Sequence, residues 1–165
     1  MSIYVAYLLI FLLGATPFFE VVGVIPIGVV AGLPALPVTI LAFLGNLLTI
    51  WLLIILMDHV IKWLHRRNEK KGKDIPSKRQ KRAVNLWKKY GLPGLAILSP
   101  LLIGSHLGAI LAMSFGATRK NITIWMTASL VLWAIVMGIA SHYGMEYFAK
   151  QTGRHGFLEH FINVE

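Results

Sequence analysis

Apolar residues dominate four stretches of this chain, and two of these stretches resemble ordinary membrane spans. Residues 38–57 and 121–141 contain no charged side chain, and about 20 such residues let an α-helix cross the roughly 30 Å of hydrocarbon in a bilayer. The other two stretches, residues 2–32 and 91–117, are too long for one straight span and too short for two. The pattern therefore predicts two spanning helices and two irregular apolar segments.

Helix-breaking residues fall inside both irregular segments. Proline and glycine disrupt helices, and broken backbone at membrane depth survives only where protein or water satisfies its polar groups. We therefore predict a re-entrant helical hairpin over residues 2–32 and another over residues 91–117, each leaving the membrane by the face it entered. A single kinked, tilted helix is the alternative for each. The breaking residues are Gly14, Pro17, Gly23, Pro26 and Gly28 in the first segment and Pro100, Gly104 and Gly108 in the second.

The two halves of the chain repeat one pattern. Thr16-Pro17, Gly32 and Val38-Thr39-Ile40 recur as Ser99-Pro100, Gly116 and Ile122-Thr123-Ile124. The pattern predicts a first copy over residues 2–57 and a second over residues 91–143, each a hairpin followed by a span. A hairpin adds no crossing, so one span separates the copies and the second is inverted. Inverted repeats place the substrate site of many transporters between their halves.

Composition supports a membrane location and the charges suggest an orientation. The 165 residues are 56% hydrophobic and only 14% charged, which is far from a soluble composition, so we predict one all-α integral membrane domain. Twelve of the 16 Lys and Arg residues lie between Lys62 and Lys89. Because cytoplasmic loops are rich in Lys and Arg, residues 58–90 are expected to be cytoplasmic, with both termini external. This block is expected to contact membrane lipids rather than nucleic acid.

Two segments outside the spans are predicted to be interfacial helices. Residues 77–90 place Ala83, Val84, Leu86 and Trp87 among six Lys and Arg residues, which is typical of a basic amphipathic helix on a membrane surface. Gly91 is expected to end this helix. The tail over residues 145–165 mixes aromatic and polar residues and predicts a second, weaker interfacial helix.

Glu20 and His106 are the main candidates for a proton pathway. Glu20 is the only acidic residue before Asp58, and an ionisable group at membrane depth is a functional hypothesis by default. Burial disfavours the charged form of a carboxylate, which lets such a group bind and release a proton. His106 is the matching residue of the second hairpin, and histidine changes charge near physiological pH. The alternatives are a hydrated interfacial Glu20 and a structural His106.

Other candidates would line the path rather than carry a proton. Gly23, Pro26, Gly104 and Gly108 are expected to supply exposed backbone near the hairpin tips, and Pro100 is expected to lie on the same pathway. Asn46 is a polar contact, or else holds neighbouring helices together. At a spacing of 83 residues, the second copy has Ile103 where the first has Glu20. We therefore expect any proton chemistry to reside in one half.

Several functional classes are not expected. The chain has no cysteine, and its acidic and histidine residues form no ligand set, so no metal site and no cofactor are predicted. No catalytic residue is predicted, because no base lies beside a candidate nucleophile. An enzyme acting on lipid phosphates would need an acidic metal cluster or an Arg and His set, so we expect no enzyme.

Several short motifs resemble those of a known family. The run from Glu20 to Gly28, followed by Gly32-Leu33-Pro34 and Gly45-Asn46, resembles the N-terminal signature of the small multidrug export protein family; Lys89-Tyr90-Gly91-Leu92-Pro93-Gly94 and Ser99-Pro100-Leu101 resemble the start of its second half. That family is related to the DedA, or VTT-domain, superfamily. The resemblance implies two facing re-entrant hairpins, lipid transport and a bacterial or archaeal cytoplasmic membrane. Val22 stands where the family often has an arginine.

These observations predict a small membrane transporter. The expected function is a proton-coupled secondary carrier or lipid translocase with its site between two opposed hairpins. The expected substrate is an amphipathic drug or a lipid-linked molecule. The alternatives are a gradient-independent lipid scramblase and a non-transporting assembly or scaffold protein. Because two spans and two hairpins give little bulk to seal a path, a homodimer is expected.

Overall fold

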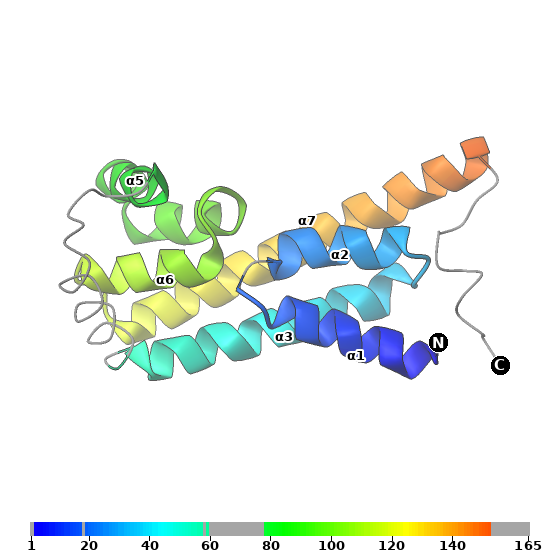
Figure 1. Ribbon diagram of the computed structural model, residues 1–165. Helices are drawn as coiled ribbons and strands as arrows, with labels where there is room; N and C mark the ends of the chain where they lie inside the picture. The colour runs from blue at the N-terminus through cyan, green and yellow to red at the C-terminus, as the bar shows by residue number, and fades with distance from the viewer. Residues whose placement is uncertain (1, 18, 58, 60–77, 153–165) are drawn as a thin grey trace. The chain divides into compact units, whose positions relative to one another are not determined.

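The described part of the protein is helical throughout. The computed structural model describes residues 2–17, 19–57, 59 and 78–152 (Figure 1). No strand occurs in these ranges, which confirms the all-α prediction. The helices are α1 (Ile3–Gly14), α2 (Glu20–Val30), α3 (Ala35–Ile55), α5 (Lys78–Leu102), α6 (Ser105–Ser114) and α7 (Arg119–Thr152).

Two helices, α3 and α7, are long and apolar enough to cross a membrane. The 21 residues of α3 extend about 31 Å at 1.5 Å per residue. This helix starts before the predicted residue 38 because Pro37 lies in its first turn, where a missing N–H costs little. The hydroxyl of Thr118 accepts a hydrogen bond from the Asn121 N–H at 3.4 Å, so it caps the start of α7.

Helix α7 is longer than its apolar stretch. It continues past residue 141 to Thr152, so residues 145–152 extend the span, whereas we had predicted that they begin a separate interfacial helix. Lys150 and Glu146 form an ion pair one turn apart, at 2.8 Å, which favours continued helix. The rest of the predicted tail lies outside the described residues.

The chain groups into two compact units. Unit 1 comprises residues 1–48 and 130–165, and unit 2 comprises residues 49–129. Unit 1 contains α1, α2, the start of α3 and the end of α7. Unit 2 contains the end of α3, α5, α6 and the start of α7. Each unit therefore combines a pair of hairpin helices with one half of each long helix.

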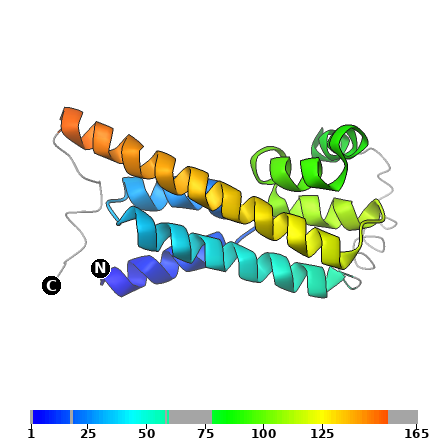
Figure 2. The same ribbon diagram turned by 180° about the vertical axis from the view of Figure 1, so that it is seen from behind.

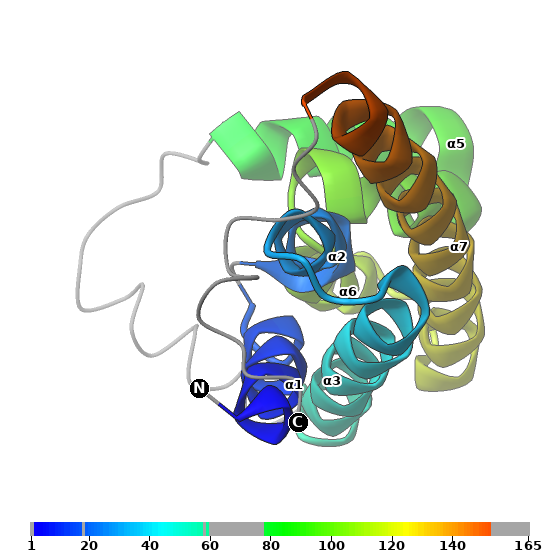
Figure 3. The ribbon, with the colours of Figure 1, turned by 90° about the vertical axis from the view of Figure 1, so that its right-hand side faces the viewer.

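Small residues bring the helices of unit 1 close together. A Cβ atom on Gly14 would lie 2.6 Å from the carbonyl oxygen of Ala42, and one on Gly45 would overlap the carbonyl oxygen of Phe11. The backbones of α1 and α3 are therefore in direct contact, as is typical of membrane helices. Figure 3 shows α1 and α2 with the start of α3 beside them. The side chain of Thr39 packs on Gly138, which joins α3 to the end of α7.

The helix of the first predicted hairpin is interrupted around Pro17, and not at Gly23 or Gly28. Helix α1 ends at Gly14 and α2 begins at Glu20. Gly23 and Pro26 lie inside α2, so they do not supply the irregular backbone expected of them. Pro26 cannot donate to the carbonyl four residues before it, yet α2 continues past it to Val30.

Helix α5 of unit 2 has a basic part and an apolar part. Gly91 interrupts it with a φ of 63°, and Figure 2 shows the two parts running in different directions. The basic part begins at Lys78 and stops at this glycine, close to the predicted range, although Ser77 lies outside the described residues. Ala83 is fully buried, and the ring of Trp87 contacts that of Phe115 with centroids 5.2 Å apart.

Some of the repeated residues adopt the same local structure in both units. Gly32 and Gly116 follow α2 and α6 with φ angles of 101° and 93°. The N–H of each glycine donates a hydrogen bond to the carbonyl three residues before it, and the N–H of the next residue donates to the carbonyl five residues before that residue. This pair of hydrogen bonds is the Schellman motif, which requires a left-handed residue. The hydroxyls of Thr16 and Ser99 also bond the carbonyls three residues before them, at 2.7 and 3.1 Å.

Candidate functional site

Glu20 lies at the turn between α1 and α2. Only 5% of its surface is exposed, and buried Val21, Val24 and Ile25 follow it along α2. Its φ of 48° makes it the only residue other than glycine with a positive φ among those described. The left-handed region costs an L-residue about 1–2 kcal/mol. A glutamate in this conformation is therefore costly in backbone energy, whereas a glycine would not be.

The backbone identifies the counterpart of Glu20 in the second repeat. The turn before α6 also contains one left-handed residue, which is Gly104 with a φ of 100°. Its spacing from Glu20 is the same as that between Gly32 and Gly116. Gly104, which lies 84 residues after Glu20, shares its positive φ, whereas a spacing of 83 residues pairs Glu20 with Ile103. The additional residue of the second copy lies between Pro100 and Gly104.

His106 lies in helix α6 and is held by hydroxyl groups of unit 2. It is 9% exposed. Its Nε2 and the Thr49 Oγ1 share a hydrogen bond at 3.1 Å, and its Nδ1 lies 3.5 Å from the Ser105 Oγ. Thr49 comes from the end of α3, so this bond ties α6 to the long helix. The structural role that we gave as the alternative is consistent with these contacts.

Gly108 brings α6 close to α5. Gly108 lies on α6, and a Cβ atom there would be 2.5 Å from the Cβ of Ser99. Ser99 is fully buried, and it directly precedes Pro100 near the end of α5. Gly108 therefore serves close helix packing rather than exposed backbone. Among these second-hairpin residues only Gly104 lies in a turn, outside the helices.

Asn46 lies fully buried on α3, beside the Gly45 contact with α1. Its repeat counterpart by spacing is Leu130, and the counterpart of Gly45 is Ser129, which is 1% exposed. The predicted site residues thus fall into two groups. Glu20, Gly23, Pro26 and Asn46 belong to unit 1, and Pro100, Gly104, His106 and Gly108 belong to unit 2.

Sequence reasoning missed a set of polar residues near the end of α7. His142, Glu146 and Lys150 recur every fourth residue and line a pocket with the loop before α3. In the sequence, only the i, i+4 spacing of these residues indicates that they share one face of a helix. The sequence analysis assigns this region to the membrane–water interface. Within the described ranges, no group of three or more Asp, Glu or His residues could hold a metal ion.

A comparison with protein families decides the affiliation of the chain. Residues 20–136, more than half of the chain, match the family model described as "Putative small multi-drug export protein". The chain belongs to this family. The matched range begins at Glu20 and includes both turns with a left-handed residue. The family description and the two long apolar helices together indicate a small membrane protein of the multi-drug export family. Comparisons with curated proteins and with solved structures give no match.

Proposed function

We propose that this protein exports amphipathic molecules across a membrane in exchange for protons, and that the Glu20 carboxylate carries the proton. The observation that carries this proposal is the burial of Glu20 in a left-handed turn. A residue kept in a strained conformation is a pointer to function. The family description supports export as the activity, and the Glu20 carboxyl in the turn supports coupling to protons.

The energetic argument is that stability alone would select glycine at this position. Glycine occupies the left-handed region without steric cost, and the second repeat has Gly104 there. The backbone cost is avoidable by a single substitution to glycine, so the retained, buried side chain supports a role in transport. A neutral, protonated carboxyl is less costly to bury than a carboxylate, which is the property a proton carrier uses.

We also propose that the two hairpins are re-entrant and inverted with respect to each other. The hairpin helices have only 10 to 12 residues in α1, α2 and α6, about 15–18 Å, and so fall short of the hydrocarbon thickness. One long helix, α3, separates the two pairs along the chain. If each pair returns to its own face, the pairs enter from opposite faces, as in known inverted-repeat transporters.

The coupling proposal is tested with purified protein in liposomes. The probe is ethidium, an amphipathic cation, and the drive is an acidic vesicle interior. Wild type is expected to accumulate ethidium, whereas Glu20→Gln is expected to lose accumulation while keeping its unfolding temperature. Glu20→Asp, which restores a carboxylate, is expected to recover part of the flux. Gradient-driven accumulation that is equal in Glu20→Gln and wild type would contradict the proposal.

The same liposomes test the lipid alternative. Fluorescent phospholipid placed in both leaflets is bleached from outside with a membrane-impermeant reductant. If the protein is a scramblase, more than half of the dye becomes accessible without any pH gradient, and Glu20→Gln leaves this unchanged. That result, together with absent ethidium transport, would replace the exporter by a scramblase.

The orientation proposal is tested with two cysteines. Pro34 and Thr118 are both exposed and occupy equivalent positions before α3 and α7, and the chain has no native cysteine. Pro34→Cys and Thr118→Cys are labelled separately with an impermeant maleimide in sealed cells and in inverted vesicles. Opposed hairpins predict labelling from opposite faces. Labelling of both from the same face would refute the inversion.

A further inference from the structure

A groove of unit 1 lies between α7 and the region where α3 begins. It consists of two adjoining pockets of about 630 and 430 Å³ that share Pro34, Ala35 and His142. The larger pocket is apolar and is lined on α7 by Ala134, Ile135, Gly138 and Ile139. The smaller one adds the charged Glu146 and Lys150. The groove is thus apolar at one end and charged at the other.

The length of the apolar stretch of α7 indicates where the charged end would lie in a membrane. The charge-free residues 121–141 of α7 extend about 31 Å, which matches the hydrocarbon core. His142, Glu146 and Lys150 come directly after this stretch on the same helix. When the apolar stretch spans the core, these three side chains reach the headgroup layer, and the apolar pocket lies within the hydrocarbon.

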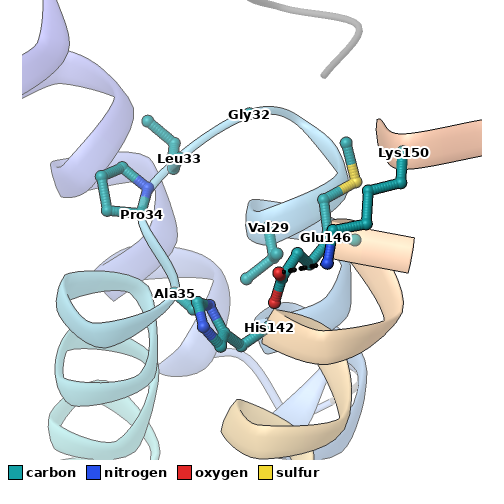
Figure 4. Close-up of a pocket in the computed structure, with 9 residues that line it drawn as sticks. Val29, Gly32, Leu33, Pro34, Ala35, His142, Glu146 and Lys150 are labelled. Atoms are coloured by element: carbon teal, nitrogen blue, oxygen red, sulfur yellow. Dashed lines mark hydrogen bonds and ion pairs between the residues drawn. The ribbon is translucent and has the colours of Figure 1, made fainter. Parts of the chain in front are cut away.

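The charges of the groove balance each other. The Lys150 Nζ and the Glu146 Oε1 are 2.8 Å apart, and both side chains are exposed. Figure 4 shows this pair and His142 along one side of α7, facing the loop that contains Pro34. An exposed ion pair of this kind contributes little to stability, so a ligand that offers the opposite charges can replace each partner. A ligand with one negative and one positive group complements such a pair.

We propose that this groove binds one zwitterionic phospholipid with an ammonium headgroup. The acyl chain occupies the apolar pocket against Ile135 and Gly138. The phosphate pairs with Lys150, with His142 beside it, and the ammonium pairs with Glu146. This inference does not depend on proton coupling at Glu20, because Glu20 does not line the groove.

The apolar half is tested with a matched pair of variants. Ile135 and Val136 are neighbours on α7 with similar exposure, 54% and 43%, but only Ile135 lines the groove. The full chain in detergent is photo-crosslinked to phosphatidylethanolamine with a diazirine on its acyl chain, and labelled peptides are mapped. Ile135→Trp is expected to lower labelling of α7 at least fivefold, and Val136→Trp to leave it unchanged. Equal labelling in both variants would overturn the site.

The headgroup half is tested by competition. Lysophosphatidylethanolamine is expected to displace the probe at a tenfold lower concentration than lysophosphatidylglycerol or a monoacylglycerol. Glu146→Gln is expected to remove the preference over lysophosphatidylglycerol, and Glu20→Gln to preserve it. Equal competition by all three amphiphiles would show that the charged end does not select the ligand, and would overturn the proposal even if the apolar pocket is labelled. Loss of ethidium transport without loss of this binding separates the two proposals.

Discussion

The α1–α2 pair of unit 1 and the α5–α6 pair of unit 2 share one backbone design but differ in their side chains. Both end in a Schellman motif, at Gly32 and Gly116, and both have one left-handed residue in their turn. In the second pair that residue is Gly104, which meets the backbone requirement without strain. In the first it is Glu20. The comparison separates what the repeated fold requires from what one copy has added.

The glycines of the two pairs also differ in their surroundings. Gly108 on α6 lies directly against Ser99, whereas a Cβ atom on Gly23 of α2 would meet nothing within 4 Å. The counterpart of Gly108 at the same spacing is the fully buried Val24. Glycines in corresponding helices thus differ in their surroundings: Gly108 lies against Ser99, and a Cβ atom on Gly28 of α2 would lie 2.8 Å from the Ile10 side chain of α1, whereas Gly23 faces open space.

The largest expected effect on stability comes from filling the contact between α5 and α6. Gly108→Val should destabilise the protein by about 3 kcal/mol, because its added carbons would overlap Ser99. Gly23→Ala is the matched control and should stabilise by about 0.5–1 kcal/mol through helix propensity. Both changes are measured by denaturant titration in detergent micelles. Similar changes in stability for the two variants would contradict the different surroundings of Gly108 and Gly23.

Substitutions at the two positions with a positive φ, Glu20 and Gly104, test the backbone strain at Glu20. Gly104→Ala should cost about 1–2 kcal/mol, because alanine pays the left-handed penalty. Glu20→Gly should stabilise by about 1 kcal/mol, since glycine adopts a positive φ without steric cost. Thermal unfolding gives both values. A destabilised Glu20→Gly would mean that the carboxyl is retained for stability rather than transport.

The smallest expected effect concerns the bond between α6 and the end of α3. Thr49→Val removes the hydroxyl that bonds His106 and should cost about 1 kcal/mol. Thr123→Val is a suitable control, because the Thr123 hydroxyl bonds only the carbonyl of Arg119 within its own helix and is exposed. Denaturant titration compares the two. A cost no larger than that of the control would argue that His106 is not held by this bond.

Much of the fold could be predicted from the sequence, because apolar length and helix-breaking residues have direct structural consequences. The two long helices and the interruption at Gly91 follow from these signals. The extension of α7 to Thr152 did not, because it depends on helix continuing through polar residues after the apolar run ends. Gly23 and Pro26 misled the prediction since both are tolerated inside α2.

The candidate site was harder to predict than the fold. Glu20 was identifiable as an isolated acid in apolar sequence, but its left-handed backbone and its pairing with Gly104 appear only in three dimensions. The role of Gly108 depends on Ser99 lying opposite it, which residue spacing does not reveal. The groove beside α7 combines residues about 110 positions apart in the sequence, such as Pro34 and His142, and no local pattern joins them.

The most direct test of the central claim measures how ethidium accumulation in liposomes responds to a pH gradient in wild type and Glu20→Gln. A gradient of one pH unit is worth about 1.4 kcal/mol per proton. Exchange of one proton for one ethidium therefore limits accumulation to about tenfold. We predict that wild type approaches this ratio and that folded Glu20→Gln gives the same internal and external concentrations with or without the gradient. A Glu20→Gln protein that still accumulates ethidium in proportion to the gradient would contradict the account.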